Sequence, residues 1–175
     1  LELGAGAGQN SMFLAAQGAH CVATDVSRRQ LAHGRQLARR LDRSLRFQRV
    51  DIDTLDQADL PLFDLVHSTY CLPFAEEPLV TLASIAGLVK PGGYLLMSSS
   101  HPAFAGEWLR LEEDEEGVFL ESYFRPRPDV RISADGENTV VSQFVSMPDV
   151  VNTLIQCGFH ILRLEEPEPP SLDPY

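Results

Sequence analysis

Hydrophobic and polar positions along the chain follow two alternating patterns. Short apolar runs of strand length lie at residues 1–3, 20–25, 45–51, 63–68 and 94–100. Segments with helical spacing separate them, at 9–17, from Ser27 onward, and at 76–89. Strands that alternate with helices in this way are typical of βαβ units, whose strands form a parallel sheet. The pattern therefore predicts an α/β fold.

Several residues mark where the predicted helices begin and end. Ser27 has Gln30 three residues after it, which is the capping-box signature of a helix start. Gly18 follows the first predicted helix, where glycine closes a helix in the left-handed conformation. The sequence "KPGG" at residues 90–93 is expected to stop the helix at 76–89.

The pattern changes after residue 100. Residues 101–138 are rich in Pro, Gly and acidic residues and have no steady period, which predicts an insertion with a short hairpin and mobile loop. Beyond it, Thr139–Ser146 and Phe159–Glu166 resemble strands on either side of a helix that ends at Gly158. The expected organisation is a single domain over residues 1–175, with a core at 1–100, the insertion, and a closing strand–helix–strand and tail at 139–175.

Composition fits a cytoplasmic globular domain. The chain has 175 residues, with 44% hydrophobic and 22% charged residues, and it contains no apolar run of membrane-spanning length. Cys21, Cys71 and Cys157 are scattered and form no CxxC pair, so we expect free thiols in a reducing compartment and no zinc site.

Charge is distributed unevenly along the chain. The net charge is −11, of which residues 1–100 carry −1 and residues 101–175 carry −10. Because nucleic-acid binding depends on neutralising phosphates, we do not expect a nucleic-acid substrate. Ser27–Arg49 is arginine-rich, and we interpret it as a helix with a solvated outer face, with an RNA-binding helix as the alternative.

The chain opens on "LELGAGAGQN", a strand end followed by a glycine-rich turn. Such a turn exposes backbone N–H groups at a helix start and lets a ligand lie against the main chain. Dinucleotide sites use G-x-G-x-x-G, whereas Gly4, Gly6 and Gly8 follow a G-x-G-x-G spacing. The turn thus departs from the dinucleotide pattern, and a tight strand–helix turn without ligand stays an alternative.

Acidic residues accompany this turn. Asp25 and Asp51 end the second and third predicted strands, and Glu2 precedes the glycines. Asp25 is placed to accept the hydroxyls of a ribose, and Asp51 the amino group of an adenine. Three carboxylates suit a ligand with cationic and donor groups and no phosphate, and S-adenosylmethionine is such a ligand. The alternative for each acid is a turn or helix-cap carboxylate, most plainly for Glu2.

Five ordered motifs resemble the class I S-adenosylmethionine-dependent methyltransferases. They are "LELGAGAG", "VATDVS", "RVDIDTL", "FDLVHSTYCLPF" and "LVKPGGYLLMSSSHP". The segment "DVVNTLIQCGFHILRLEEPEPP" is similar to the closing helix and strand of the small-molecule branch of that family. The resemblance implies a doubly wound, mostly parallel, Rossmann-like sheet. It also implies S-adenosylmethionine as cofactor and S-adenosylhomocysteine as product.

The resemblance also assigns cofactor contacts. Gly4 and Gly6 are expected under the methionine part, with Glu2 fixing the loop and the amino group, and the Ser68 carbonyl contacting the ammonium. Asp25 is expected to hold the ribose. The remaining contacts are with adenine, through Val26, Asp51 and the backbone N–H of Ile52.

Methyl transfer from a sulfonium is an in-line displacement, so the protein mainly aligns the nucleophile and excludes water. A general base is needed only where the acceptor must lose a proton. His101 follows the fifth predicted strand and is the candidate base, with a lid or turn histidine as the alternative. Tyr70 is expected to close over the cofactor or shape the acceptor pocket, unless it is a packed aromatic.

The fourth motif lacks the "NPPY"- or "DPPY"-like run of enzymes that methylate amino groups of nucleic acids and proteins. This favours a small-molecule O-, N- or C-methyltransferase. Aromatic residues in the insertion predict a lid over an apolar or aromatic acceptor: Phe104, Trp108, Phe119, Tyr123 and Phe124.

The ends of the sequence bear on function. Members of this family carry a helix before the first strand and an antiparallel strand after the last motif, and neither pattern is found here. We expect a sheet incomplete at both ends and a longer parent protein. Two other functions stay open: a truncated, non-catalytic binding module and a nicotinamide-nucleotide oxidoreductase.

Overall fold

The computed structural model describes residues 1–102, 107–112, 115–119, 123–124, 127–133, 136 and 139–167. For 107–112 and 115–119 it describes the course of the backbone only.

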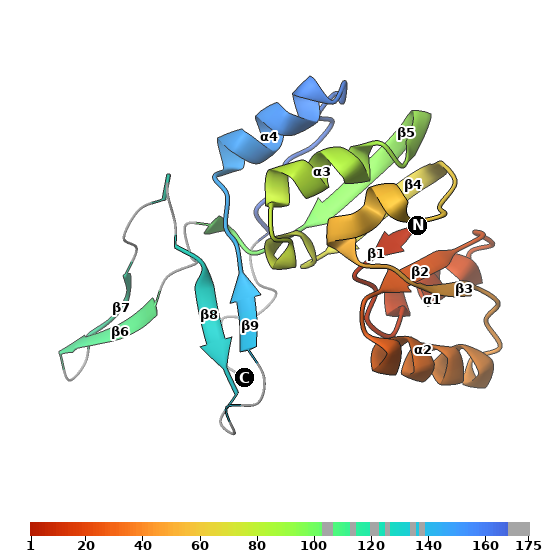
Figure 1. The fold of residues 1–175 in the computed structure, drawn as a ribbon, viewed down its shortest axis with the longest axis horizontal. Helices are drawn as coiled ribbons and strands as arrows, with labels where there is room; N and C mark the ends of the chain where they lie inside the picture. The colour runs from red at the N-terminus through yellow and green to blue at the C-terminus, as the bar shows by residue number, and fades with distance from the viewer. Residues whose placement is uncertain are drawn as a thin grey trace.

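The centre of the fold is a five-stranded sheet in which every neighbouring pair is parallel (Figure 1). The strand order is β3-β2-β1-β4-β5. The strands are β1 (Glu2–Leu3), β2 (Val22–Asp25), β3 (Arg46–Arg49), β4 (Phe63–Thr69) and β5 (Val89–Ser98). Because all five run the same way, their carboxyl ends meet at one edge, which is where ligands bind in open sheets of this kind.

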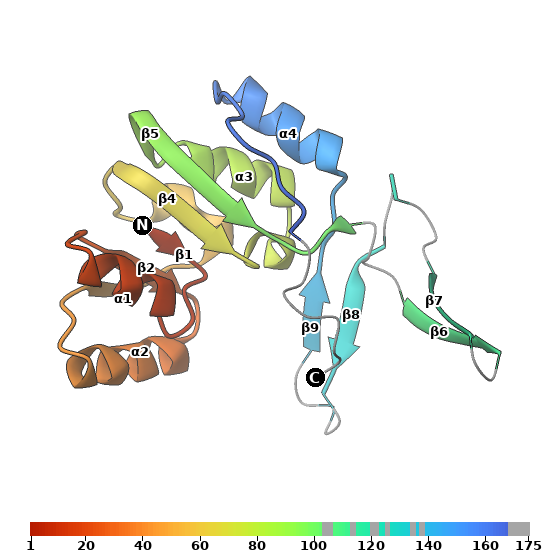
Figure 2. The same cartoon turned by 180° about the vertical axis from the view of Figure 1, so that it is seen from behind.

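Helices cover both faces of the sheet. They are α1 (Gln9–Ala16), α2 (Arg28–Arg40), α3 (Pro78–Ala86) and α4 (Met147–Gln156). In Figure 1, α3 lies over one face of β4 and β5, with α4 beside it; in Figure 2, α1 and α2 lie on the opposite side. The predicted doubly wound, mostly parallel α/β fold is confirmed.

The main core lies between the sheet and α3. Leu3, Val66, Leu82 and Ile85 are at most 2% exposed and belong to one apolar cluster. Leu3 and Val66 belong to β1 and β4, the central strands of the sheet, whereas Tyr94 and Leu96 on the edge strand β5 are exposed.

The local signals for helix ends behave as predicted. The Ser27 hydroxyl accepts a hydrogen bond from the Gln30 N–H at 3.3 Å, and Ser27 is the N-cap of α2. Gly18 has φ +94° after α1, and Gly158 has φ +89° after α4. Both values lie in the left-handed region that glycine adopts without steric cost.

Two segments correct the expectations. "KPGG" does not separate a helix from a strand, because β5 begins at Val89 and includes it; the pairing with β4 is shifted there, and Gly92 has φ +76°. The prediction of a strand at Phe159–Glu166 is wrong: the segment contains no strand, and Leu162 and Leu164 are exposed. A strand needs a hydrogen-bonded neighbour, and the sheet that the structure describes gives this segment none.

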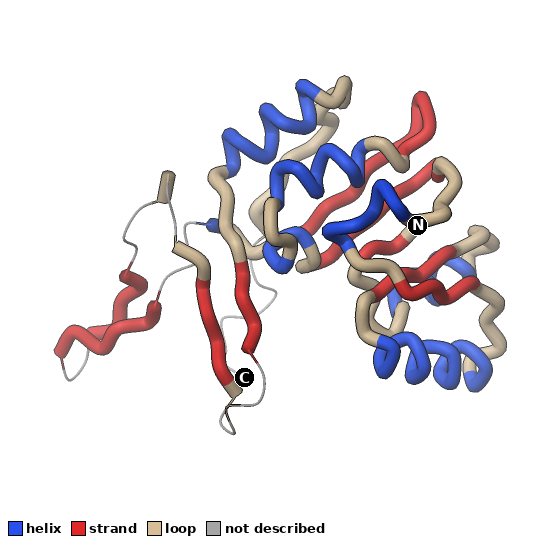
Figure 3. Tube along the Cα trace, viewed as in Figure 1, coloured by secondary structure: helices blue, strands red, loops and turns tan. Residues whose placement is uncertain are grey.

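Two antiparallel pairs follow the sheet along the chain (Figure 3). They are β6 (Glu107–Glu112) with β7 (Glu115–Phe119), and β8 (Asp129–Ile132) with β9 (Thr139–Ser142). The predicted strand at 139–146 is thus shorter than expected, because Ser146 serves as the N-cap of α4 and accepts from the Asp149 N–H. Within the described residues, every helix is too short or too polar to cross a bilayer.

Gly34 in α2 allows the helix to approach the glycine turn closely. A Cβ at this position would lie 2.6 Å from the Ala7 carbonyl oxygen and 2.6 Å from the Phe47 ring. Both distances are shorter than real Cβ contacts, so α2 would have to shift away from the turn.

We predict that Gly34→Ala lowers the free energy of unfolding by about 1–3 kcal/mol, the usual cost of overpacking. Urea unfolding followed by circular dichroism measures it. Gln36→Ala, an exposed position on the same helix, is the control and should change stability by less than about 0.5 kcal/mol. If Gly34→Ala were as stable as the wild type, the close approach of α2 would be wrong.

Candidate cofactor and acceptor site

The glycine turn lies at the carboxyl edge of the sheet, between β1 and α1. Gly4, Gly6 and Gly8 all have positive φ, of +63°, +55° and +77°. A Cβ at Gly6 would meet nothing within 4 Å, whereas one at Gly4 would collide with the Cys71 side chain at 2.5 Å. The turn therefore needs glycine, and it has open space beside Gly6.

Glu2 is buried beneath the turn. Its carboxylate accepts hydrogen bonds from the Asn10 amide and from both the N–H and the hydroxyl of Ser11. The carboxylate thus binds an unpaired N–H of the first turn of α1, which is the backbone-bonding alternative for this acid. Its predicted contact with an amino group stays a prediction.

Asp25 joins the glycine turn to the next helix. Its Oδ2 accepts from the Gly6 N–H and its Oδ1 from the Ser27 N–H, both at 2.7 Å. A carboxylate has about four acceptor positions, so these bonds leave each oxygen able to accept one more. Val26 follows and is 51% exposed. The edge of the site therefore carries a fixed carboxylate beside an open apolar side chain.

Asp51 lies two residues after the end of β3, and its side chain is exposed. Its Oδ1 accepts from the Asp53 N–H at 3.2 Å, which caps the short 3₁₀ helix Ile52–Gln57. The side chain of Ile52 packs against the core. Asp51 thus acts as a turn carboxylate, and its predicted adenine contact stays a prediction.

Ser68 and Cys71 are at the carboxyl end of β4, beside β1. Ser68 pairs with Leu3 and is 1% exposed, and its hydroxyl lies close enough to the Cys71 thiol to lower that thiol's pKa. Cys71 is buried against Gly4. Burial, followed by the negative charge of Asp25, raises the pKa of the Cys71 thiol to about 11. The thiol is therefore protonated at neutral pH.

Tyr70 and His101 follow the carboxyl ends of β4 and β5. Tyr70 follows β4 with φ +54°, unusual for a non-glycine residue, and its N–H donates to the Ser98 carbonyl at the end of β5. Its side chain is 56% exposed. His101 comes three residues after Ser98, and its Nε2 lies 2.8 Å from Glu166 Oε1. The adjacent ends of β4 and β5 thus carry both predicted acceptor-side residues.

The predicted aromatic lid is described only in part. Phe104 lies outside the described residues, as do the side chains of Trp108 and Phe119. Tyr123 and Phe124 pack edge to face with centroids 5.2 Å apart, and the Tyr123 hydroxyl accepts from the Met147 N–H. This bond ties the insertion to the start of α4.

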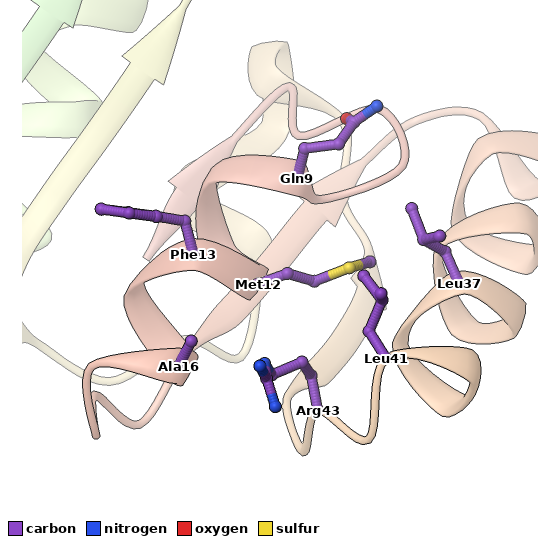
Figure 4. A pocket seen from close by; sticks show the side chains of 7 residues that line it. All are labelled: Gln9, Met12, Phe13, Ala16, Leu37, Leu41 and Arg43. Atoms are coloured by element: carbon purple, nitrogen blue, oxygen red, sulfur yellow. The ribbon is translucent and has the colours of Figure 1, made fainter.

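A separate groove lies between α1 and α2 (Figure 4). Its lining residues are Gln9, Met12, Phe13, Ala16, Leu37, Leu41 and Arg43. None of the predicted site residues lines it. Within the part of the chain that the structure describes, no three His, Cys, Asp or Glu side chains are placed to hold a metal ion.

A parallel α/β sheet with a glycine turn after β1, an acid at the end of β2 and another after β3 is typical of proteins that bind nucleosides. Residues 1–97, more than half of the chain, match the family described as "Methyltransferase domain". The chain belongs to this family, which confirms the resemblance seen in its motifs.

Individual relatives agree with this assignment. The chain is 39% identical over 101 residues to a demethylmenaquinone methyltransferase of Clavibacter sepedonicus, covering 55% of this chain and 39% of that protein. It is 31% identical over 170 residues to a demethylmenaquinone methyltransferase of Tropheryma whipplei, covering 91% and 65%. An S-adenosylmethionine-dependent methyltransferase from Mesorhizobium loti has the same fold, with a TM-score of 0.75 at 25% identity over 94% of this chain and 74% of that one. The chain thus spans 39% to 65% of the length of these two curated relatives.

The residues of this edge fit S-adenosylmethionine, the cofactor that membership of this family implies. The open space beside Gly6 leaves room for a ligand against the backbone of the turn. Asp25 retains acceptor capacity for a diol, and carboxylates suit a cationic ligand.

Sequence reasoning missed three residues of this region. Cys71 was predicted only as a free thiol, although it lies against Gly4. Asp53 accepts from the Glu76 N–H and the Thr81 hydroxyl, which fixes the loop after β4 to the loop after β3. Glu166 approaches His101 from the segment that follows α4. The position of Cys71 just after a predicted strand could have indicated that it lies near the site. No spacing rule connects residues as distant in sequence as His101 and Glu166.

The raised pKa of Cys71 predicts its reactivity. Because its pKa is about 11, only about one thiol in a thousand is ionised at pH 8, and alkylation should be slow and rise steeply with pH. Exposed Cys157 should react much faster. Iodoacetamide labelling with peptide mass spectrometry measures both rates, and protein in urea is the control, where all three cysteines should react alike. Equal alkylation rates for Cys71 and Cys157 in the folded protein at pH 8 would contradict the burial and the raised pKa of Cys71.

Proposed function

We propose that this protein transfers a methyl group from S-adenosylmethionine to a small-molecule acceptor. The observation that carries the proposal is the Asp25 carboxylate, held by the Gly6 and Ser27 N–H groups beside exposed Val26. A fixed carboxylate next to an exposed apolar side chain supports Asp25 as the acceptor for a ribose diol and Val26 as the surface for the adenine. The relatives are named as methyltransferases, which supports the same activity.

On the cofactor side, each group has one task. When bound, S-adenosylmethionine supplies an electrophilic methyl group on a positively charged sulfur. Gly4 and Gly6 admit the methionine part, Glu2 fixes their turn through α1, and the Ser68 carbonyl accepts from the ammonium. Asp25 accepts from the ribose hydroxyls.

The base of the nucleoside is held further along the same edge. Val26 packs on the adenine, while Asp51 accepts from its amino group and the Ile52 N–H donates to a ring nitrogen. The carboxylates of Asp25, Asp53 and Asp51 all lie close enough to Cys71 to help raise the pKa of its thiol. A site with this much negative charge favours a cationic ligand over a phosphate.

On the acceptor side, Tyr70 and His101 shape the reaction. Tyr70 is held by its N–H bond to Ser98 with an exposed ring, which lets the ring close over the cofactor. His101 takes the proton from an acceptor hydroxyl while the oxygen attacks the methyl group in line.

An aromatic hydroxyl is the acceptor that these groups suit best. The described side chains of the insertion include the ring pair Tyr123 and Phe124, and Phe124 is 78% exposed. The two curated relatives compared above are named for demethylmenaquinone. We therefore propose hydroquinones or phenols as acceptors, and a cytoplasmic location in keeping with three free cysteines.

Asp25→Asn is predicted to weaken S-adenosylhomocysteine binding about 10- to 100-fold. Asparagine keeps the shape of the side chain but loses the charge and one acceptor, and a hydrogen bond to a charged group contributes about 1.5–3 kcal/mol. Isothermal calorimetry measures the dissociation constant. Asp42→Asn, at an exposed left-handed position after α2, is the matched control and should bind normally. Unchanged S-adenosylhomocysteine binding by Asp25→Asn would refute the ribose contact. If the wild type bound NAD and not S-adenosylhomocysteine, an oxidoreductase would be favoured.

His101→Gln is predicted to lower kcat about 10²- to 10⁴-fold with phenolic acceptors, because general bases contribute rate factors of this size. Catechol and 1,4-naphthohydroquinone are the probes, with methyl gain followed by mass spectrometry. S-adenosylhomocysteine affinity should not change. Exposed His160→Gln is the control. A His101→Gln protein with wild-type kcat would show that the acceptor needs no base at this position.

A further inference from the structure

His101 meets a carboxylate from the far end of the described chain. Its Nε2 lies 2.8 Å from Glu166 Oε1. Glu166 belongs to the segment that follows α4, shown dark blue in Figure 2, which returns along β5 toward its carboxyl end. The segment forms no strand, so no backbone hydrogen bonds to a neighbouring strand determine its course.

The two partners differ in exposure. The His101 side chain is 28% exposed and is followed by buried Pro102, whereas the Glu166 side chain is 72% exposed. Ion pairs with one exposed partner add little to stability, commonly below 1 kcal/mol. The contact therefore has small structural value, and its effect falls mainly on the orientation of the imidazole.

We propose that Glu166 is a positioning residue for His101, an inference that rests on the proposed function. The carboxylate accepts the Nε2–H, which selects the tautomer whose proton-accepting atom is Nδ1. The same arrangement orients the histidine base in catalytic triads, where a carboxylate holds the ring and faces the imidazolium that forms.

The step that this arrangement serves is balanced. The acceptor O–H bond breaks and its proton moves to His101 Nδ1. The acceptor oxygen forms a bond to the methyl carbon while the carbon–sulfur bond breaks, and that electron pair stays on sulfur. The Glu166 carboxylate faces the new positive charge on the ring.

The neighbouring Glu165 provides a matched control. It forms an ion pair with Arg163 within the same segment. It has the same charge and the same local backbone as Glu166, but a different partner. A merely structural effect of removing a carboxylate from this segment should appear in both variants.

The pairing is tested first without any reaction. Long-range ¹H–¹⁵N NMR of the imidazoles in the full-length protein reports which ring nitrogen carries the proton, and His101→Gln assigns the signal. We expect the Nε2–H tautomer in the wild type and in Glu166→Gln, which keeps the acceptor oxygen. Glu166→Ala should give a mixture of tautomers. A mixture in the wild type, or an unchanged signal in Glu166→Ala, would overturn the proposal.

Kinetics then test the role in catalysis. With catechol and 1,4-naphthohydroquinone, Glu166→Ala should lower kcat about tenfold or more, with smaller changes in KM and S-adenosylhomocysteine affinity. Glu166→Gln should lose less than Glu166→Ala, and Glu165→Ala should match the wild type. The loss should be larger for acceptors with less acidic hydroxyl groups, because those depend more on the base. Equal effects of Glu165→Ala and Glu166→Ala would overturn the proposal.

Failure of the proposed function gives a different result. If the wild type binds S-adenosylhomocysteine but methylates neither probe, the proposed acceptor class fails. The tautomer measurement still decides whether Glu166 orients His101.

Discussion

The Asp25 carboxylate, bonded to the N–H groups of Gly6 and Ser27, is the contact on which the site depends. It joins the end of β2 to the glycine turn of β1 and to the start of α2. Two further bonds reinforce the same junction: the Ala5 N–H donates to the Thr24 carbonyl, and the Thr24 hydroxyl donates to the Glu2 carbonyl. Two neighbouring strand ends are thereby fixed as one unit, and an acid is held in place before any ligand arrives.

The hydrogen bonds also fix the negative charges of the site in place. Glu2 and Asp25 are held by backbone and side-chain donors, so their oxygens have fixed positions. Asp25, Asp53 and Asp51 together help to raise the pKa of the buried Cys71 thiol, after the larger effect of burial. The outer face of α2 is arginine-rich and exposed, so opposite charges lie on different sides of this half of the fold. The acids at the carboxyl edge of the sheet suit a cationic nucleoside, in keeping with the methyltransferase domain family.

Much of the fold could be predicted from sequence because its signals are local. The capping role of Ser27 and the left-handed glycines Gly18 and Gly158 depend on a few adjacent residues. The errors lie where distant partners decide. Phe159–Glu166 has a strand composition but no hydrogen-bonded neighbour, and "KPGG" is taken into β5 by its shifted pairing with β4. In the site, strand-end positions indicated Asp25, but the contact of Cys71 with Gly4 and of Glu166 with His101 arises only from the tertiary structure.

A crystal structure of the protein with bound S-adenosylhomocysteine tests the central claim most directly. The expected result is that both ribose hydroxyls lie within hydrogen-bond distance of the Asp25 carboxylate, which keeps its bonds to Gly6 and Ser27. The adenine should lie against Val26, and the homocysteine chain beside Gly6. A ligand bound elsewhere, or a ribose turned away from Asp25, would contradict the assignment of this sheet edge as the cofactor site.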